Sequence, residues 1–336
     1  MNMLEFEAKH WESGCKYIAG IDEAGRGPLA GPVVAAAVIF PYEIELPEVN
    51  DSKKISEKKR EKLYDEIYDA ALAVGVGIVH EDEIDEKNIL QATFMAMRQS
   101  IGQLSIKPDI LLIDGNEADI RHYKQESIIN GDQKSLSIAA ASIIAKVFRD
   151  RMMRQYDIVF PKYGFSKHKG YGTKQHMEAI RTRKASPIHR QSFNPVSHHL
   201  PTFSYLQRNR LISRLGEQLT ACQFIRSGHE ILETNYNVPK VGDIDIISRD
   251  NGVLVFTEVT TKTADHGWGE LRSQIDKNKG DRIMNSVQHY IETNEFDCDF
   301  RFDAGEVILG KGKPKIKILE ESLSIILNNT VKNKEI

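Results

Sequence analysis

The chain has 336 residues, more than one ordinary domain holds, and this length predicts about two domains. Hydrophobic residues make up 40% of the chain and charged residues 28%, a composition that supplies packed cores and excludes an intrinsically disordered protein. The formal net charge of −3 is small, but the charges are unevenly distributed along the chain.

The cysteines and the apolar segments indicate in which cellular compartment the protein is expected. Cys15, Cys222 and Cys298 are odd in number and widely spaced, which favours a reducing environment over a disulfide framework. The first fifteen residues are polar and mixed in charge, unlike a signal peptide. The longest apolar run, residues 33–40, is too short to cross a bilayer. We therefore expect a cytoplasmic protein with no membrane partner.

The first part of the chain alternates between strand-like and helix-like segments. Strands are expected over residues 17–22, 33–40, 75–80 and 109–114, and helices over residues 56–73, 88–104, 135–157 and 173–183. This alternation predicts an α/β architecture in which helices pack on a sheet.

A proline-containing polar stretch, residues 186–202, ends this pattern. Beyond it, helices are expected over residues 203–222 and 276–293, and strands over residues 230–236, 241–247 and 253–259. We therefore predict a first domain over residues 1–200, a linker over 201–207, a second small α/β domain over 208–328 and a tail over 329–336.

Residues 146–190 form a basic segment. It holds twelve Lys or Arg residues against three acidic ones, a local excess that attracts polyanions. Tyr163, Phe165 and Tyr171 lie among these charges and offer rings for stacking, which favours nucleic acid over a merely solvated surface. Three of its positive residues lie near one acid, Asp150, and could reach phosphate: Lys146, Arg149 and Arg151.

Three carboxylates stand at the ends of apolar strands. Asp22 and Glu23 follow one strand, and Asp114 ends another. Strands between helices are buried on both faces, so a carboxylate there has to be hydrogen-bonded, paired or bound to metal. Because ligand sites open at strand ends in α/β sheets, we expect these acids to share a site.

A fourth acid continues the apolar face of the helix expected over residues 135–157. Ala140, Ile143, Val147 and Asp150 follow at three- and four-residue steps and share one side of that helix. Four acids without His or Cys are typical of a site for Mg²⁺ or Mn²⁺, and two such ions can hold the attacking and leaving oxygens in phosphodiester cleavage. The plainer alternative is that each acid caps a turn or pairs with an arginine.

The turn between the first two strands is a second candidate binding site. Glycines on both sides of Arg26 let the backbone approach a ligand closely, with amides for a sugar hydroxyl and the guanidinium for phosphate. Gly25, Gly27 and Ala30 also match a dinucleotide-binding fingerprint, which has to open a helix. Pro32 and the Val/Ala run after it favour a strand instead, so we discount that alternative.

Six segments in this order resemble the type 2 ribonuclease H family, ribonuclease HII, over about residues 17–196. They are GIDEAGRGPLAGPV (20–33), DSKK (51–54), IDG (113–115), AKVFRDR (145–151), HKGYGT (168–173) and SPIHRQSF (186–193). Phe148 departs from the threonine more usual at its position.

The resemblance implies a ribonuclease-H-like fold, in which helices flank a mixed sheet and a helical lobe follows. It implies two divalent ions, Mn²⁺ or Mg²⁺, held by four catalytic acids: Asp22, Glu23, Asp114 and Asp150. It also implies hydrolysis of the RNA strand of RNA–DNA hybrids, with cuts on the 5′ side of ribonucleotides that leave 3′-hydroxyl and 5′-phosphate ends. Such enzymes remove RNA primers and start the excision of ribonucleotides from DNA. The expected partners are therefore RNA–DNA hybrids and DNA duplexes that contain ribonucleotides.

The same resemblance implies particular substrate contacts. Gly25, Arg26 and Gly27 would read the 2′-hydroxyl at an RNA–DNA junction, and Tyr171 would pack against the adjoining deoxyribose. The remaining expected contacts are Lys53, Lys54, Lys146, Arg190 and Ser192. For Lys53, Lys54 and Ser192, a solvated surface position is nearly as good an interpretation.

From about Arg208 the chain resembles the uncharacterised YraN-type family, which is similar to restriction-endonuclease-like folds. The matching segments are GE (216–217), GHEIL (228–232), GDIDII (242–247), FTEV (256–259) and FRFD (300–303). Nuclease relatives use an Asp and a Glu-x-Lys to bind metal. Here Asp245 and Glu258 are present, but Thr260 replaces the lysine and Lys262 lies two residues on. We therefore expect a remnant site in a domain that binds DNA or a protein partner, or stabilises the first domain, with a live second nuclease as the alternative.

Two other classes of function stay open on the residues alone. A non-catalytic protein could bind RNA–DNA junctions without cutting them, although binding alone needs no cluster of acids. A dinucleotide-dependent enzyme is the more distant alternative.

Overall fold

The computed structural model describes residues 3–42, 44–46, 48–49, 55–115, 120–263, 277–310 and 312–321. The chain forms two compact units. The first comprises Met1–Met153 and Ser166–Leu200, and the second comprises Arg154–Phe165 and Pro201–Ile336. Within the described ranges, no helix is long and apolar enough to span a membrane. The three cysteines are free.

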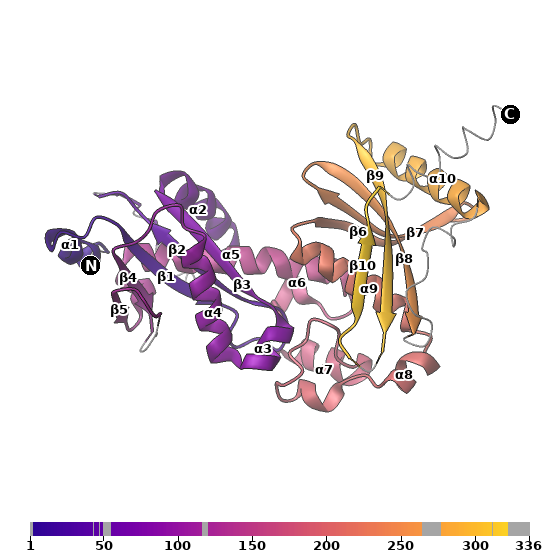
Figure 1. The fold of residues 1–336 in the computed structure, drawn as a ribbon, viewed down its shortest axis with the longest axis horizontal. Helices are drawn as coiled ribbons and strands as arrows, with labels where there is room; N and C mark the ends of the chain where they lie inside the picture. Colours follow the sequence, from indigo (N-terminus) through magenta and orange to yellow (C-terminus); the bar gives the residue numbers. More distant parts are fainter. Residues whose placement is uncertain are drawn as a thin grey trace. The chain divides into compact units, whose positions relative to one another are not determined.

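The first unit contains a five-stranded sheet with strands in the order β3-β2-β1-β4-β5 (Figure 1). The strands are β1 (Ile18–Ala24), β2 (Val33–Ile39), β3 (Ala73–Val79), β4 (Ile110–Asp114) and β5 (Gln125–Ile128). β1 pairs in antiparallel fashion with β2 and in parallel with β4. This arrangement confirms the expected mixed sheet, while β5 is a strand that the sequence pattern did not predict.

The first unit also contains helices, some of which pack on its sheet (Figure 1). They are α1 (Glu5–Glu12), α2 (Glu57–Ala70), α3 (Glu81–Lys87), α4 (Ile89–Gly102), α5 (Leu136–Val159), α6 (Phe165–His168) and α7 (Lys174–Arg183), together with the 3₁₀ turns η1 (Gly131–Gln133) and η2 (Val196–His199). Both α5 and α6 cross a unit boundary, because the second unit takes Arg154–Phe165.

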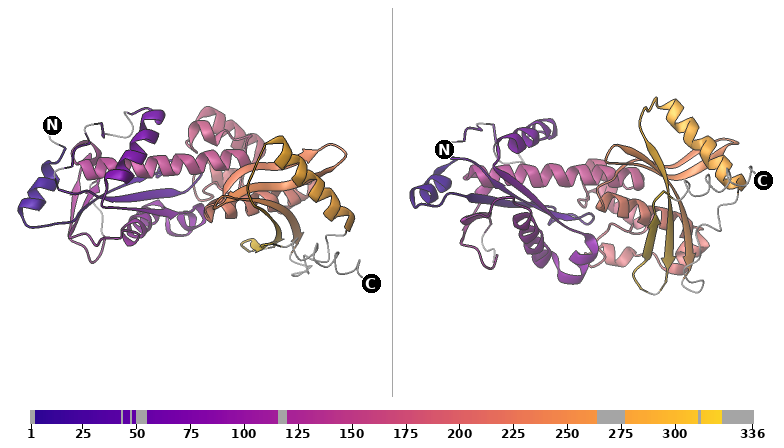
Figure 2. Two further views of the ribbon diagram at one scale, coloured as in Figure 1. Left: turned by 90° about the horizontal axis from the view of Figure 1, so that it is seen from above. Right: turned by 45° about the horizontal axis from the view of Figure 1, so that its top comes forward.

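Glycines let α4 and α5 approach opposite faces of the sheet (Figure 2). A β-carbon on Gly77 would lie 2.0 Å from the Ala96 carbonyl oxygen of α4, and one on Gly20 would lie 2.1 Å from the Ser137 carbonyl carbon of α5. Gly20 pairs with Val38, whereas Gly77 pairs with Ala35, and residues at odd spacing along a strand point to opposite faces. Both helices therefore contact the sheet backbone directly.

The N-terminus of α5 is capped by a carboxylate from α1. Glu7 is 2% exposed, and its Oε1 accepts hydrogen bonds from the Ser135 hydroxyl at 2.6 Å, the Ser137 hydroxyl at 2.6 Å and the Ser137 amide at 3.0 Å. A negative charge at a helix N-terminus satisfies free amides and interacts favourably with the helix dipole. Glu7 thus holds one end of the longest helix in the described part of the chain.

The second unit contains another five-stranded sheet, in the order β10-β9-β8-β7-β6. Its strands are β6 (Glu230–Val238), β7 (Gly242–Asp250), β8 (Val253–Thr263), β9 (Phe300–Leu309) and β10 (Lys315–Leu319), and its helices are α8 (Phe203–Arg208), α9 (Ile212–Arg226) and α10 (Lys277–Thr293). Among its described strands, only β8 and β9 pair in parallel. Ile283 and Tyr290 of α10 pack with Phe256 and Phe302 in its core.

The predicted helix over residues 203–222 is two helices in the structure, α8 and α9. They are separated at Arg210, which has a φ of 56°. A left-handed conformation is incompatible with a continuous α-helix, so the chain turns between α8 and α9.

We expect the Glu7→Ala variant to lower the free energy of unfolding by about 1–3 kcal/mol, because it leaves buried donors at the α5 N-terminus unsatisfied. Urea denaturation of the full chain measures this change. Glu5→Ala is the matched control, since Glu5 lies on the same helix but is exposed. Equal stability of the two variants would contradict the capping role.

Candidate active site

Asp22 lies near the end of β1 and is 5% exposed. Its Oδ1 accepts a hydrogen bond from the Glu23 amide at 2.7 Å, and its carboxylate also accepts one from the Ser142 hydroxyl of α5. Burial raises the pKa of Asp22 well above its usual value, and repulsion from Glu23 and Asp114 adds to this effect. Asp22 is therefore a desolvated carboxylate crowded by two others.

Asp114 ends β4, the parallel neighbour of β1. The register pairs Ile21 with Ile113, so Asp22 and Asp114 follow at the same edge of the sheet. Asp114 is half-buried, and its Oδ1 accepts a hydrogen bond from the Gly131 amide at 2.6 Å. The sheet thus brings together two acids that are far apart in the sequence.

Glu23 faces the turn that follows β1. Its side chain is 13% exposed, and its Oε1 lies 3.2 Å from Nη1 of Arg26. The Arg26 side chain is 52% exposed. This ion pair links the acids to the glycine-rich turn.

Asp150 is buried on α5, at 3% exposure, and its Oδ1 lies 2.8 Å from Nζ of Lys146. It follows Ser142, which contacts Asp22, by eight residues, or about 12 Å along a helix axis. Burial lowers the pKa of Lys146, and the Asp150 carboxylate offsets part of this shift. The structure therefore brings Asp22, Glu23 and Asp114 close enough to repel one another, and it pairs Asp150 with Lys146.

The chemistry of these acids suits a hard divalent cation. Across the described residues, no three or more His, Cys, Asp or Glu side chains are arranged as a ready-made metal cage. Burial is the larger cause of the raised pKa of Asp22, but the repulsion from Glu23 and Asp114 that adds to it is of the kind that a bound cation relieves. All the donors are oxygens, which suit Mg²⁺ or Mn²⁺ rather than zinc.

A buried arginine holds the turn at residues 25–31. Arg190 is 0% exposed, and its guanidinium donates hydrogen bonds to the carbonyl oxygens of Gly25, Arg26, Pro28 and Gly31 at 2.5–3.0 Å. These bonds use all of its N–H groups. The arrangement corrects the expectation that Arg190 contacts substrate, because its side chain positions the turn instead.

A second buried arginine ties the same turn to the loop before α7. Arg149 is 1% exposed, and it donates to the carbonyl oxygens of Pro32 at 2.8 Å, Ala30 at 3.0 Å and Lys169 at 2.9 Å. A β-carbon on Gly25 would lie 2.2 Å from Nε of Arg149, so only glycine fits there. Arg149 therefore does not reach phosphate, contrary to expectation.

The turn and Tyr171 form one exposed surface. Tyr171 is 45% exposed, and its Cε1 would lie 3.6 Å from a β-carbon on Gly27. Arg26 and Gly27 are also exposed. The structure thus brings the Tyr171 ring beside the turn with which it was expected to act. We name the surface formed by Arg26, Gly27 and Tyr171 the junction surface.

Residues 25–32 do not open a helix. They form a turn that leads into β2, a strand. Because a dinucleotide-binding fingerprint requires a helix at this point, the structure removes that alternative.

Two histidines hold the backbone at Tyr171. His176 and His189 are both 0% exposed. Nδ1 of His176 lies 2.9 Å from the Tyr171 carbonyl oxygen, and its Nε2 lies 2.9 Å from Nε2 of His189. Burial lowers the pKa of His176 to about 4 and that of His189 to about 3. Sequence reasoning gave neither a role, because a lone histidine in a motif is as often a core residue.

Other expected contacts differ in their outcome. Lys53 and Lys54 lie outside the described residues. Ser192 is exposed, and its hydroxyl donates to Oδ1 of Asp85 at 2.5 Å. The expectation that Tyr163 and Phe165 stack on bases is corrected, because both are buried and stack on each other with ring centroids 5.4 Å apart.

In the second unit, Asp245 and Glu258 lie close together. Burial, followed by repulsion from Glu258, raises the pKa of Asp245 to about 8, and its Oδ2 accepts a hydrogen bond from the Val259 amide at 2.7 Å. Glu258 pairs with Lys279 of α10. Lys262 instead lies 2.7 Å from Oε1 of Glu306.

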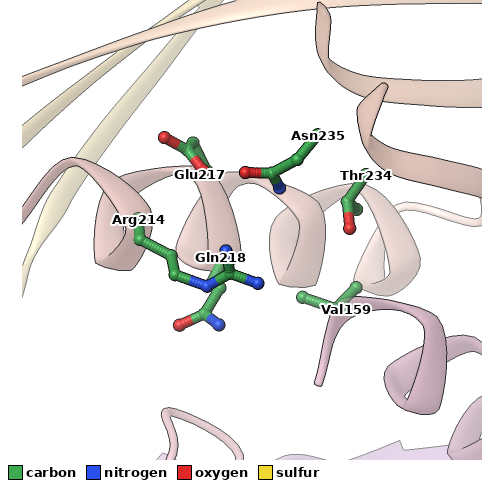
Figure 3. A pocket seen from close by; sticks show the side chains of 6 residues that line it. All are labelled: Val159, Arg214, Glu217, Gln218, Thr234 and Asn235. Carbon is green, nitrogen blue, oxygen red and sulfur yellow. The ribbon is translucent and has the colours of Figure 1, made fainter. Parts of the chain in front are cut away.

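A small pocket lies beside α9 in the second unit (Figure 3). It is lined by Val159, Arg214, Glu217, Gln218, Thr234 and Asn235. Neither Asp245 nor Glu258 lines it, but Glu217 does, and the Glu217 carboxylate adds to the rise in the pKa of Asp245.

Comparison with known proteins assigns the first unit. A ribonuclease HII family model matches residues 19–196. Ribonuclease HII from Acetivibrio thermocellus is 56% identical over 193 residues, which cover 57% of this chain and 75% of that relative. Ribonuclease HII from Syntrophus aciditrophicus is 54% identical over 197 residues, which cover 59% of this chain and 93% of that relative.

Solved structures and a second family model complete the comparison. Ribonuclease H2 from Pyrococcus horikoshii is 25% identical, with a TM-score of 0.48 over 58% of this chain and 99% of that one. A structure of a PCNA complex of ribonuclease HII from Archaeoglobus fulgidus gives 29% identity and a TM-score of 0.47 over 56% of this chain and 98% of that one. Residues 216–307 match the model of the uncharacterised protein family UPF0102.

We expect His176→Phe to weaken the pH dependence of stability. The pKa of His176 falls from 6.5 to about 4 on folding, so the unfolded chain binds more protons between these values and wild-type stability falls as the pH falls. Between about pH 7.5 and about pH 5, this one group accounts for roughly 1–2 kcal/mol of the loss. Urea denaturation at both pH values measures the difference, and equal losses in wild type and variant would contradict it.

Proposed function

The chain belongs to the ribonuclease HII family and is an endoribonuclease of that family, and from this premise we propose how and where it cuts. The proposed reaction is hydrolysis on the 5′ side of a ribonucleotide embedded in duplex DNA, leaving 3′-hydroxyl and 5′-phosphate ends. RNA primer removal and ribonucleotide excision are the proposed tasks. The observation that carries the proposal is the gathering of Asp22, Glu23 and Asp114 next to the junction surface.

The four acids are the proposed metal ligands: Asp22, Glu23, Asp114 and Asp150. Two bound divalent ions, Mg²⁺ or Mn²⁺, would supply charge neutralisation at the scissile phosphate and a more acidic attacking water. The protein fixes two of these carboxylates before substrate arrives, since the Glu23 amide holds Asp22 and the Gly131 amide holds Asp114. Lys146, beside Asp150, is the proposed cationic contact to the phosphate.

The junction surface is proposed to read the sugar. The carbonyls of Gly25 and Arg26 point to Arg190, and in a trans peptide the following N–H points the opposite way. The amides of Arg26 and Gly27 are therefore directed away from Arg190, where a 2′-hydroxyl can accept their hydrogen bonds. Tyr171 would pack on the adjoining deoxyribose, where a second 2′-hydroxyl would clash, and Arg26 would hold phosphate.

For the second unit we propose a remnant site that binds DNA or a protein partner without cutting. The pairing of Lys262 with Glu306, and of Glu258 with Lys279, supports this assignment. No lysine of β8 is paired with the two acids, so the group that would orient water in a nuclease of this type is engaged elsewhere.

Replacing Asp22 or Asp114 with Asn should reduce cleavage of an RNA–DNA hybrid at least about 100-fold, because a lost metal ligand removes several kcal/mol of transition-state stabilisation. Hybrid binding should persist. Cleavage rates and gel-shift titrations measure the two effects. Asp109→Asn is the matched control, since Asp109 lies exposed at the other end of β4. Full activity in either variant would refute the assignment.

The Asp114→Asn variant also tests the second unit, because the active site of its first unit should be inactive. We expect no metal-dependent cleavage of DNA by this variant. Residual cleavage that Glu258→Ala abolishes would instead indicate a live second nuclease.

Arg26→Ala and Tyr171→Ala should reduce selectivity for a single ribonucleotide more than they reduce the rate on continuous RNA. Loss of ring or phosphate contacts of this kind costs about 1–2 kcal/mol, or about tenfold in the ratio of kcat/KM values. Steady-state kinetics on the two substrates measure it. Tyr42→Ala, at another exposed tyrosine, should leave the ratio unchanged. An unchanged ratio in Tyr171→Ala would remove Tyr171 from the junction surface.

A further inference from the structure

Three histidines form a cluster behind the junction surface to which the proposed function assigns no role. The rings of His168 and His176 stack with centroids 4.4 Å apart, and those of His176 and His189 lie 5.1 Å apart. His168 is 9% exposed, whereas the other two have no exposure. His176 and His189 therefore cannot meet substrate or solvent water directly, and any effect they have on the site has to pass through their hydrogen bonds.

The hydrogen bonds determine which ring nitrogens carry protons. Nδ1 of His189 accepts from the Ser186 amide at 3.0 Å, so the proton of neutral His189 is on Nε2. That Nε2–H donates to Nε2 of His176 at 2.9 Å, which leaves the proton of His176 on Nδ1. Nδ1–H of His176 in turn donates to the Tyr171 carbonyl oxygen at 2.9 Å. In this series of hydrogen bonds, each ring N–H therefore donates in the direction of Tyr171.

His168 also bonds to this backbone segment. Its carbonyl oxygen accepts the Tyr171 amide at 2.9 Å, and its Nδ1 accepts the Gly170 amide at 3.2 Å. Both backbone polar groups of Tyr171 are therefore bonded within the histidine cluster or to Thr173, whose amide also donates to the Tyr171 carbonyl at 2.8 Å.

The Tyr171 ring depends on this backbone for its position. The side chain is 45% exposed and lies against Gly27, which offers no side chain to grip it. The hydrogen bonds that fix the Tyr171 backbone therefore help to set the orientation of its ring.

We propose that His176 and His189 are positioning residues for junction recognition, acting as a directed hydrogen-bond relay that holds Tyr171 across Gly27. This inference rests on the proposed function of Tyr171. Because both rings stay neutral near pH 7, the direction of donation does not reverse under working conditions.

The test is a double-mutant cycle between His176→Phe and Tyr171→Ala in the full chain. Phenylalanine retains a ring to stack on His168 but loses both hydrogen bonds. The measured quantity is the ratio of kcat/KM for a single ribonucleotide in DNA to that for continuous RNA. We expect either single variant to lower the ratio about tenfold. The double variant should lower it no further, because His176 affects recognition only through its hold on Tyr171.

Two further variants separate positioning from general destabilisation. Ile180→Val removes one buried methylene from α7, the helix that carries His176, and should leave the ratio unchanged. His176→Asn places an amide nitrogen near the position of Nδ1 and should restore most of the ratio. Multiplicative losses in the double variant, or an unchanged ratio in His176→Phe while Tyr171→Ala loses it, would overturn the relay.

A measurement without substrate distinguishes failure of the relay from failure of the proposed function. Histidine ¹H–¹⁵N correlation spectra of the wild type should show the Nδ1–H tautomer for His176 and the Nε2–H tautomer for His189. Reversed tautomers would overturn the relay regardless of activity. If the tautomers are as expected but Tyr171→Ala keeps its selectivity, the proposed role of Tyr171 is refuted, and the functional part of this inference with it.

Discussion

Two buried guanidinium groups, those of Arg149 and Arg190, hold the site of the first unit in one shape. Burying positive charge is costly unless it is bonded or compensated, and here carbonyl oxygens of the turn and loop take up the donors while Glu81, itself 2% exposed, supplies negative charge to both. The turn after β1 is thus bonded to α5 and to the loop before α7. Neither arginine can be removed without leaving those carbonyls unpaired.

This constraint couples chemistry to recognition. β1 carries Asp22 and Glu23, and it runs directly into the turn whose amides Arg190 directs outward. α5 contacts the same strand at Gly20, and its Ser142 donates a hydrogen bond to Asp22. Further along α5, Arg149 contacts the turn at Gly25. One strand and one helix therefore fix the acids and the junction surface together, so a shift in either element displaces both.

The sequence predicts the parts of this site that depend on local pattern, and misses those that depend on long-range hydrogen bonds. Acids ending apolar strands identify Asp22 and Asp114, because burial makes charge there exceptional. The same logic fails for Arg190, since a buried arginine and a surface arginine look alike within a basic segment. It also fails for Glu7. This residue lies in a polar segment without helical periodicity, and its hydrogen-bond partners are 128 and 130 residues away. The ion pair between Asp150 and Lys146 likewise depends on side-chain geometry, which the spacing of residues along the sequence does not determine.

The most direct measurement of the central claim maps the cut made by the wild-type chain in a DNA duplex that contains one ribonucleotide, with Mg²⁺ and Mn²⁺ in separate reactions. We expect a single cut at the phosphate on the 5′ side of that ribonucleotide, and an intact strand when the same position carries a deoxyribonucleotide, which offers the outward amides no 2′ oxygen. Cleavage on the 3′ side, or equal cleavage of the all-DNA duplex, would contradict it.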